Sequence, residues 1–221
     1  DWVSQVVRLY QDSPFVEFEW TVGPIPIQDN IGKEIVSRFS SNLQNADVFY
    51  TDSNGREILE RRNNFRPTWK LVQTEMVAGN YFPVNSRIYI KDEAMDTQLA
   101  VMTDRSQGGA SPIHGSIELM VHRRLLYDDA LGVAEHLNET GADGKGLIIR
   151  GKHYVLLNDL ASANRTHRDF AEKLFMQPVT SIAANNLSPA DYSKKYATSG
   201  SGLQSGTLPE NVHLLTLQGW R

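Results

Sequence analysis

Short runs in which apolar and polar residues alternate, separated by turn residues, are the feature that most limits what this chain can fold into. In residues 15–22, FVEFEWTV, apolar side chains alternate with Glu17, Glu19 and Thr21. A period of two places one set of side chains on the buried face of a strand and the other set in water. Residues 23–26, GPIP, end the run, because proline cannot donate to a sheet. The pattern predicts an antiparallel strand.

Similar runs predict strands along most of the chain. We expect them at residues 1–10, 31–43, 48–51, 69–74, 87–91, 99–103, 116–126 and 212–217, and a hairpin of residues 147–150 and 152–157 around Gly151. Residues 104–115 are rich in glycine, serine and proline, which predicts a loop. Residues 57–62, EILERR, have the local propensity of a helical turn. Their place between the Asn54-Gly55 turn and Pro67 favours an extended, basic edge strand instead.

One segment has the periodicity of a helix. In Ala163–Gln177, the apolar residues Phe170, Leu174 and Phe175 recur at helical spacing, and a proline follows the segment. Residues 183–206 are rich in Ser, Asn, Ala and Gly, which predicts a flexible loop. Many short strands, frequent turns and one short helix predict a mainly β fold, an antiparallel β-sandwich or barrel.

Charge and composition exclude several classes of protein. The net charge is −4 and the pI about 5.9, so the chain has no basic field to hold nucleic acid or an anionic membrane. No apolar run approaches the length of a membrane span. The chain has no cysteine, which excludes disulfides, thiol nucleophiles and cysteine metal sites. We therefore expect neither nucleic acid nor a membrane as partner.

The residues that could carry catalysis form no complete set. The six histidines are scattered and show neither an HExxH motif nor a close pair, so we expect no metal site in this chain. Asp128-Asp129 invites a catalytic or metal-binding interpretation, but neighbouring residues on a strand point to opposite faces. A pair at a loop entry that caps nearby amides is the favoured alternative.

Three sequons fit the acceptor pattern for N-glycosylation, at Asn138, Asn164 and Asn186. We expect them in loops or at a helix start, where a glycan has room. A proline directly after the third sequon makes it a poor acceptor. Such tripeptides also arise by chance at roughly one per hundred residues, so three in one chain are a weak indication of secretion.

Residues 48–90 combine two turn signals, several arginines and aromatic clusters. Pyranose rings stack on aromatic faces, and sugar hydroxyls bond to amides and guanidinium groups, so the composition suits a sugar-binding surface. The alternative is ordinary packing of edge strands and loops in a β-rich protein.

Four blocks of the sequence resemble glycoside hydrolase family 38. They are residues 49–57 (FYTDSNGRE), 78–90 (AGNYFPVNSRIYI), 103–109 (TDRSQGG) and 118–129 (ELMVHRRLLYDD). The resemblance is dense over residues 1–157, thins through the helix and the polar loop, and returns at residues 208–217. Because several blocks occur in the right order, the chain is identified as a member of this family. FYTDSNGRE and VHRRLL favour the lysosomal α-mannosidase branch.

The resemblance implies that residues 1–221 are the C-terminal β-rich part of a multi-domain enzyme, a mutarotase-like super-sandwich. The whole enzyme would be a zinc-dependent, retaining exo-α-mannosidase that removes terminal α-linked mannose from N-glycans. The zinc ligands and the aspartate nucleophile of the family lie upstream of this part. We therefore expect no catalytic residue in this chain, and zinc only in the complete enzyme.

The resemblance also implies partners and a compartment. The N-terminal catalytic part would be present as a separate or cleaved chain, since lysosomal members are cut into peptides that stay associated. We expect mannose-containing glycans as ligands, a homo-oligomer of the processed enzyme, and a lysosomal or secreted location. The role of this chain would be to buttress the catalytic domain and line the substrate site.

The family sends one tyrosine from this region into the mannose site, and the matching residue here is Tyr81. The following residue in relatives is often a second tyrosine and here is Phe82, which leaves Tyr81 to supply the hydroxyl. Asn80 and Arg87 are weaker candidates for substrate binding. Their structural alternatives are turn formation and a salt bridge on a strand face.

Two other functions remain open from the residues. A free-standing, sugar-binding β-sandwich without catalysis would need no larger polypeptide. A sandwich-type sugar isomerase would need an acid/base pair around a cleft, and the carboxylates show no such pairing in the sequence.

Overall fold

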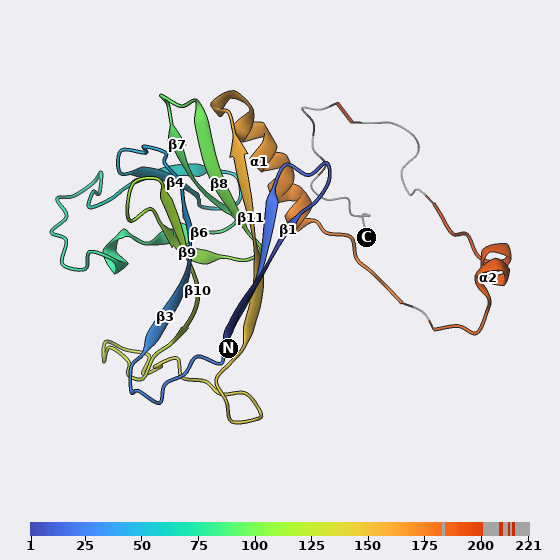
Figure 1. The fold of residues 1–221 in the computed structure, drawn as a ribbon, viewed down its shortest axis with the longest axis horizontal. Helices are drawn as coiled ribbons and strands as arrows, with labels where there is room; N and C mark the ends of the chain where they lie inside the picture. Colours follow the sequence, from blue (N-terminus) through green and yellow to red (C-terminus); the bar gives the residue numbers. More distant parts are fainter. Residues whose placement is uncertain (183, 201–207, 210–211, 213, 215–221) are drawn as a thin grey trace, which may run out of the picture. The chain divides into compact units, whose positions relative to one another are not determined.

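Two antiparallel β-sheets lie against each other in a computed structural model of the chain (Figure 1), which describes residues 1–182, 184–200, 208–209, 212 and 214. The chain divides into two units, Asp1–Gln177 and Pro178–Arg221. The strands are β1 (Val3–Leu9), β2 (Val16–Val22), β3 (Lys33–Ser40), β4 (Val48–Asp52), β5 (Ile58–Arg62), β6 (Phe82–Val84), β7 (Arg87–Asp92), β8 (Thr97–Thr103), β9 (Gln107–Ala110), β10 (Ser116–Arg124) and β11 (Ile149–Asn158). The helical elements are the 3₁₀-helix η1 (Ala78–Asn80), α1 (Leu160–Phe175) and, in the second unit, α2 (Pro189–Lys195). The predicted β-sandwich is confirmed.

The larger sheet has seven strands in the order β1-β2-β11-β8-β7-β4-β5, and the smaller has four in the order β3-β10-β9-β6. All nine pairings among the described strands are antiparallel, and four of them, β1-β2, β4-β5, β7-β8 and β9-β10, join strands that follow each other directly in the chain. Two cores follow from the period of two along the strands. Ile88 and Ile90 on β7 point between the sheets, while Tyr89 points to the other face of the larger sheet.

The first core fills the space between the two sheets. Its members are buried apolar residues of both sheets and of the segment before β4: Leu43, Phe49, Val84, Ile88, Ile90, Leu99, Val101, Ile117 and Leu119. A second core lies between the larger sheet and α1, which runs along β11 in Figure 1 and contacts β8 and β11. Phe15 stacks on Phe170 of α1, with 4.3 Å between the ring centroids. Burial of these two faces is the main source of stability of the first unit.

A single buried carboxylate ties a turn of one hairpin to the start of another strand. Asp52 has no exposed surface and lies at the end of β4. It accepts hydrogen bonds from the backbone N–H of Gly55 at 2.9 Å, of Ser86 at 2.9 Å and of Arg87 at 2.9 Å. It also accepts from the Asn85 N–H and the Ser86 hydroxyl. Asp52 thus fixes the Ser53–Gly55 turn against the beginning of β7.

Most predicted strands are present, and the extended basic edge at residues 57–62 is confirmed as β5, an edge strand of the larger sheet. The strand predicted at 69–74 is wrong: these residues lie in the loop between β5 and η1. The glycine-rich segment 104–115, predicted as a loop, contains β9. Gly109 is required there, because a Cβ would lie 2.6 Å from Val84 Cγ2 in the core.

The hairpin predicted around Gly151 is also wrong, because residues 149–158 form one continuous strand. The reason for the glycine is close packing, since a Cβ at Gly151 would lie 2.3 Å from the Trp20 ring. The helix predicted at Ala163–Gln177 is confirmed as α1, with Asp159 as its N-cap. The sequence reading missed α2 within residues 183–206. The strand predicted at 212–217 lies mostly outside the described residues.

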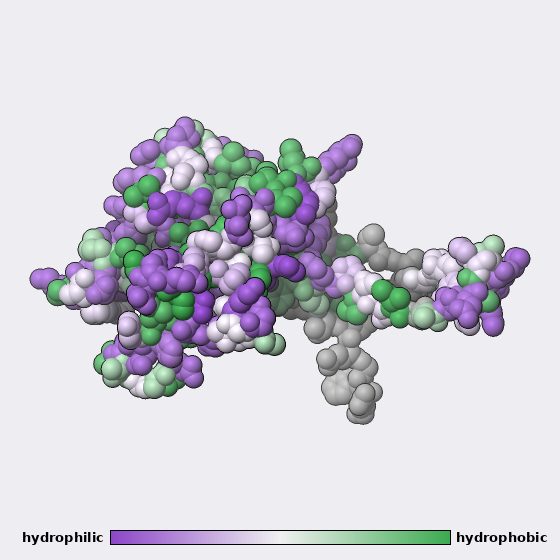
Figure 2. Space-filling view, turned by 60° about the horizontal axis from the view of Figure 1, so that its bottom comes forward, coloured by the Kyte–Doolittle hydropathy of each residue, from purple (hydrophilic) through white to green (hydrophobic). Residues whose placement is uncertain are grey.

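Within the described residues, neither helix has the length and hydropathy needed to cross a membrane. The surface of the first unit is mixed, with hydrophobic patches among hydrophilic side chains on the face shown in Figure 2.

Two histidines are buried in the first unit. His153 Nε2 lies 2.8 Å from Gln107 Oε1, whereas the two ring nitrogens of His167 have no hydrogen-bond partner among the described residues. Burial, and after it the charges of Arg87 and Arg168, lowers the pKa of His167 from 6.5 to about 4. Burial likewise lowers the pKa of His153 to about 4. Both rings are therefore neutral in the folded protein at neutral pH.

We expect His167→Leu to flatten the dependence of stability on pH. The unfolded chain protonates this ring near pH 6.5 and the folded chain only near pH 4, so the free energy of unfolding falls as the pH is lowered between these values. The loss from one such histidine is about 3 kcal/mol. Denaturant unfolding at pH 7 and pH 4 measures it, with His136→Leu at an exposed position as the control. An equal loss in the His167→Leu variant and in the wild type would contradict this assignment.

Candidate functional site

Tyr81 lies between η1 and β6, on the outer face of the smaller sheet. Its ring covers the backbone of Gly108 on β9, where a Cβ would come within 3.2 Å of Tyr81 Cδ1. The tyrosine hydroxyl donates a hydrogen bond to the carboxylate of Glu118 on β10. Because position 108 is a glycine, the Tyr81 ring fits over the backbone of β9. Its hydroxyl is held by Glu118 of β10.

Glu118 is itself held by an arginine of the neighbouring strand. Glu118 and Arg38 are opposite each other in the register of β10 and β3, so both side chains stand on the same face. Arg38 Nε donates to Glu118 Oε2 at 2.7 Å, and its Nη2 contacts the same oxygen. Glu118 is 4% exposed. A carboxylate this deeply buried requires such a cationic partner.

The electrostatics keep the Tyr81 hydroxyl protonated. Burial raises its pKa first, and the hydrogen bond to Glu118 and the charge of that carboxylate raise it further. The proton of the hydroxyl is directed to Glu118, so the oxygen retains lone pairs that can accept a hydrogen bond from another hydroxyl. The cluster of Tyr81, Glu118 and Arg38 is thus a rigid acceptor site on the sheet surface.

Aromatic and cationic side chains also meet at Phe82, the residue after Tyr81, which packs against the core between the sheets. The guanidinium carbons of Arg61 and Arg66 lie 4.6 Å and 4.8 Å from the centroid of the Phe82 ring. Such stacking is typical of arginine on aromatic faces. The structure therefore brings together aromatic and guanidinium groups of the type that the sequence predicts for residues 48–90.

The two weaker candidates are engaged inside the fold. Asn80 is 6% exposed, and its amide bonds to the Asn64 backbone N–H at 2.8 Å, the Asn64 side chain and the Met76 carbonyl. Arg87 is 1% exposed and donates to the Gly55 carbonyl at 2.8 Å. Burial lowers the pKa of Arg87, while Asp52 opposes this. Both side chains use partners other than Glu118, and a role in substrate binding stays a prediction for each.

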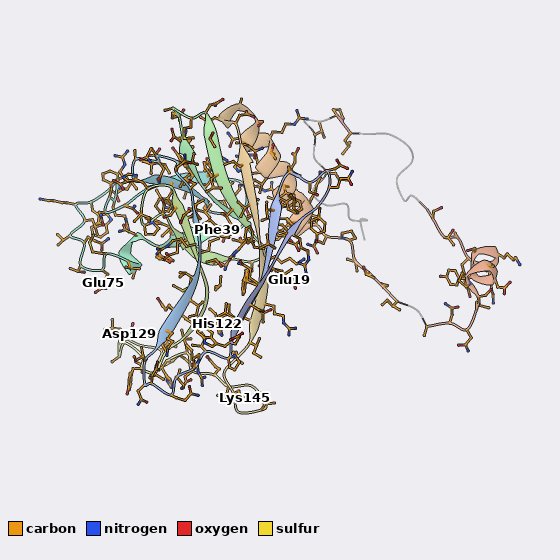
Figure 3. All side chains as sticks on the ribbon, viewed as in Figure 1. Glu19, Phe39, Glu75, His122, Asp129 and Lys145 are labelled. Carbon is orange, nitrogen blue, oxygen red and sulfur yellow. The ribbon has the colours of Figure 1, made fainter. Side chains whose placement is uncertain are left out.

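Asp128 and Asp129 are both exposed and lie in the segment that follows β10; Asp129 is labelled in Figure 3. Asp128 accepts from the Ala130 N–H at 2.6 Å, and Asp129 from the Leu131 N–H at 3.0 Å. The capping interpretation of this pair is confirmed. Among the described residues, no three His, Asp or Glu side chains are grouped so that they could hold a metal ion, so this part of the chain does not fit zinc.

The three sequons have different surroundings. Asn164 is exposed but lies within α1 rather than at its start, and Asn186 is exposed in the second unit. The side-chain oxygen of Asn138 accepts from Arg124 Nε at 2.6 Å. Glycosylation of each stays a prediction.

A cavity of about 530 Å³ lies elsewhere, between the C-terminal end of α1 and the larger sheet. It is lined by charged residues that include Glu19, Asp104 and Lys152, with Glu19 labelled in Figure 3. Glu19 pairs with Arg8 at 2.5 Å, and Asp104 accepts from the Lys152 N–H. These carboxylates serve ion pairs and backbone bonds of the sheet.

The sequence reading missed Arg38 and Glu118. The signal was a single carboxylate among the apolar residues of 116–126, opposite an arginine in a neighbouring run. Only the register of β3 and β10 shows that the two side chains meet.

Comparison with known proteins gives a consistent set of matches. The family profile described as "Glycosyl hydrolases family 38 C-terminal domain" matches residues 1–131. The lysosomal alpha-mannosidase of Felis catus is 56% identical over 219 residues, and that of Homo sapiens is 54% identical over 219 residues. Each alignment covers 99% of this chain and 21% of the relative, so the chain spans about a fifth of these proteins. A solved alpha-mannosidase from Enterococcus faecalis V583 matches 76% of this chain and 17% of that chain, at 15% identity and a TM-score of 0.49.

We expect Glu118→Gln to lower the pKa of the Tyr81 hydroxyl, because the substitution removes a negative charge that disfavours the phenolate. NMR titration of protein with ¹³C-labelled tyrosine rings measures the change, with the Tyr81→Phe variant used to assign the signal. Glu34→Gln is the matched control, since Glu34 contributes less to the shift than Glu118 does. An equal Tyr81 pKa in wild type and Glu118→Gln would exclude Glu118 as the partner.

Proposed function

The chain belongs to the family of glycosyl hydrolase family 38 C-terminal domains, and from this we propose that it is the C-terminal β-sandwich part of an α-mannosidase. The observation that carries the proposal is identity of 54–56% to lysosomal alpha-mannosidases over 99% of the chain. Because the chain spans only 21% of those relatives, it acts as one part of a longer polypeptide. The difference in length between this chain and its relatives favours a domain of a larger enzyme over a free-standing, sugar-binding sandwich.

The whole enzyme is a retaining exo-α-mannosidase that hydrolyses terminal α-linked mannose of N-glycans. In a retaining reaction a carboxylate attacks the anomeric carbon and water later releases the sugar. The carboxylates and the zinc of this reaction belong to the N-terminal catalytic part, since the described residues of this chain offer no group of metal ligands. That part is the principal partner, whether in the same polypeptide or as a cleaved chain.

In the complete enzyme, the sandwich supports the catalytic domain and contributes Tyr81 to the substrate site. Its hydroxyl oxygen accepts a hydrogen bond from a mannose hydroxyl, while Glu118 and Arg38 hold the ring in place. The geometry supports this role because the phenol is fixed before substrate arrives, so little conformational entropy is lost on binding.

The compartment of the enzyme is the lysosome, and at least one of its sequons carries a glycan. Support comes from the names of the relatives and from the exposed positions of Asn164 and Asn186. The processed enzyme assembles as a homo-oligomer, a proposal that follows from the family resemblance.

Hydrolysis of an aryl α-mannoside tests the proposed function. We expect activity from the complete polypeptide that contains this chain and none from purified residues 1–221 alone. Turnover by the isolated chain would place a nucleophile in it and overturn the proposal. A protein that purifies with no larger polypeptide and binds mannose without hydrolysis would support the free-standing sandwich instead.

Tyr81→Phe in the complete enzyme is expected to lower kcat/KM by about tenfold to a hundredfold, because one hydrogen bond to the transition state is worth about 1.5–3 kcal/mol. The change removes one oxygen and keeps the ring over Gly108, so folding is retained. Tyr127→Phe, at a tyrosine that is 83% exposed, is the matched control for loss of a hydroxyl. An unchanged kcat/KM would remove Tyr81 from the substrate site.

A further inference from the structure

The loop of residues 63–77, which joins β5 to η1, exposes several large apolar side chains to solvent. Its exposed apolar side chains are Phe65 (48%), Trp69 (58%), Val72 (77%), Met76 (62%) and Val77 (69%). The loop extends away from both sheets, and Glu75 marks it in Figure 3. Five exposed apolar side chains within fifteen residues are typical of an interaction site.

A pair of cations without counter-ions lies at the base of this loop. Arg61 and Arg66 both stack on Phe82, and both are half-buried. None of the ion pairs among the described residues includes either guanidinium. Burial lowers the pKa of Arg61, and the neighbouring charge of Arg66 lowers it further. Two like charges held this close on one ring favour a carboxylate partner from outside the chain.

The loop is tied to the site residue by direct bonds. Arg66 Nη2 donates to the Gly79 carbonyl at 2.5 Å, and the Asn64 and Asn80 amides bond to each other at 2.9 Å. Gly79 and Asn80 directly precede Tyr81. The loop is therefore held to the backbone that leads into Tyr81, while its stacking partner Phe82 packs against the core between the sheets.

We propose that residues 61–77 form a docking surface for an acidic surface with apolar surroundings on the rest of the polypeptide. The proposal rests on the proposed function, since the partner is the remaining part of the enzyme. Residues 61–77 contain four cationic residues and one acidic residue, whereas the whole chain has a net charge of −4. The docking surface is therefore a basic island in an acidic chain, and it selects a partner of opposite charge.

Composition supports the choice of a protein partner. Tryptophan, methionine, phenylalanine and arginine are the residues enriched at the centres of protein interfaces. The relatives are about five times as long as this chain, since it spans 21% of them, so a large protein surface is available in the same molecule. A carboxylate of that surface would pair with Arg61 and Arg66 while Trp69 and Met76 become buried.

Oxidation of methionine by dilute hydrogen peroxide tests the proposal on the complete enzyme. Met76 is 62% exposed and Met95, in the turn between β7 and β8, is 48% exposed, so this chain by itself predicts similar rates or a faster rate at Met76. We expect Met76 to be oxidised at least tenfold more slowly than Met95, as measured by peptide mass spectrometry. Comparable rates at the two residues would overturn the proposal.

Charge reversal tests the electrostatic part. Arg66→Glu should raise the oxidation rate of Met76 at least threefold, whereas Arg123→Glu, at an exposed arginine paired with Glu34, should leave it unchanged. Protection of Met76 that persists in Arg66→Glu would exclude an acidic partner. These rates are read from the protein and not from catalysis, so a complete protein that lacks mannosidase activity but protects Met76 would overturn the proposed function alone.

Discussion

The arrangement of β4 and β7 depends on the hydrogen bonds that the buried carboxylate of Asp52 accepts. It joins the end of β4, the Ser53–Gly55 turn and the first residues of β7 through backbone hydrogen bonds. A carboxylate with no exposed surface must satisfy its oxygens within the protein, because an unpaired buried charge is very costly. The strands β4 and β7 on either side of it are therefore held in one register.

Because side chains alternate along each strand, the two faces of each sheet have different surroundings. The larger sheet buries one face against the smaller sheet and the other against α1. The smaller sheet has only its inner face in a core, so its outer face is free to carry Arg38, Glu118 and Tyr81. Arg38 and Glu118 stand on strands of this sheet, so ladder hydrogen bonds limit the movement of the two residues that hold the Tyr81 hydroxyl.

Under the proposed function, the same arrangement is what this chain contributes to the reaction. Glu118 accepts the hydrogen bond of the Tyr81 hydroxyl, and Arg38 holds Glu118 in place. The hydroxyl is therefore already oriented in this chain alone. The neighbouring loop exposes apolar and cationic side chains that this chain alone does not satisfy. Under the two proposals above, another part of the polypeptide would complete the site and cover the loop.

The sequence was enough to predict a mainly β fold, most strands, helix α1 and the aromatic, arginine-rich stretch, because these depend on local periodicity and turn chemistry. It misplaced Gly109 and Gly151, which serve as points of close packing with Val84 and Trp20 rather than as turns. It also missed the Arg38–Glu118 pair. These contacts could not be predicted from the sequence. Cross-strand register and contacts between distant segments are set by how the sheets pack and not by neighbouring residues.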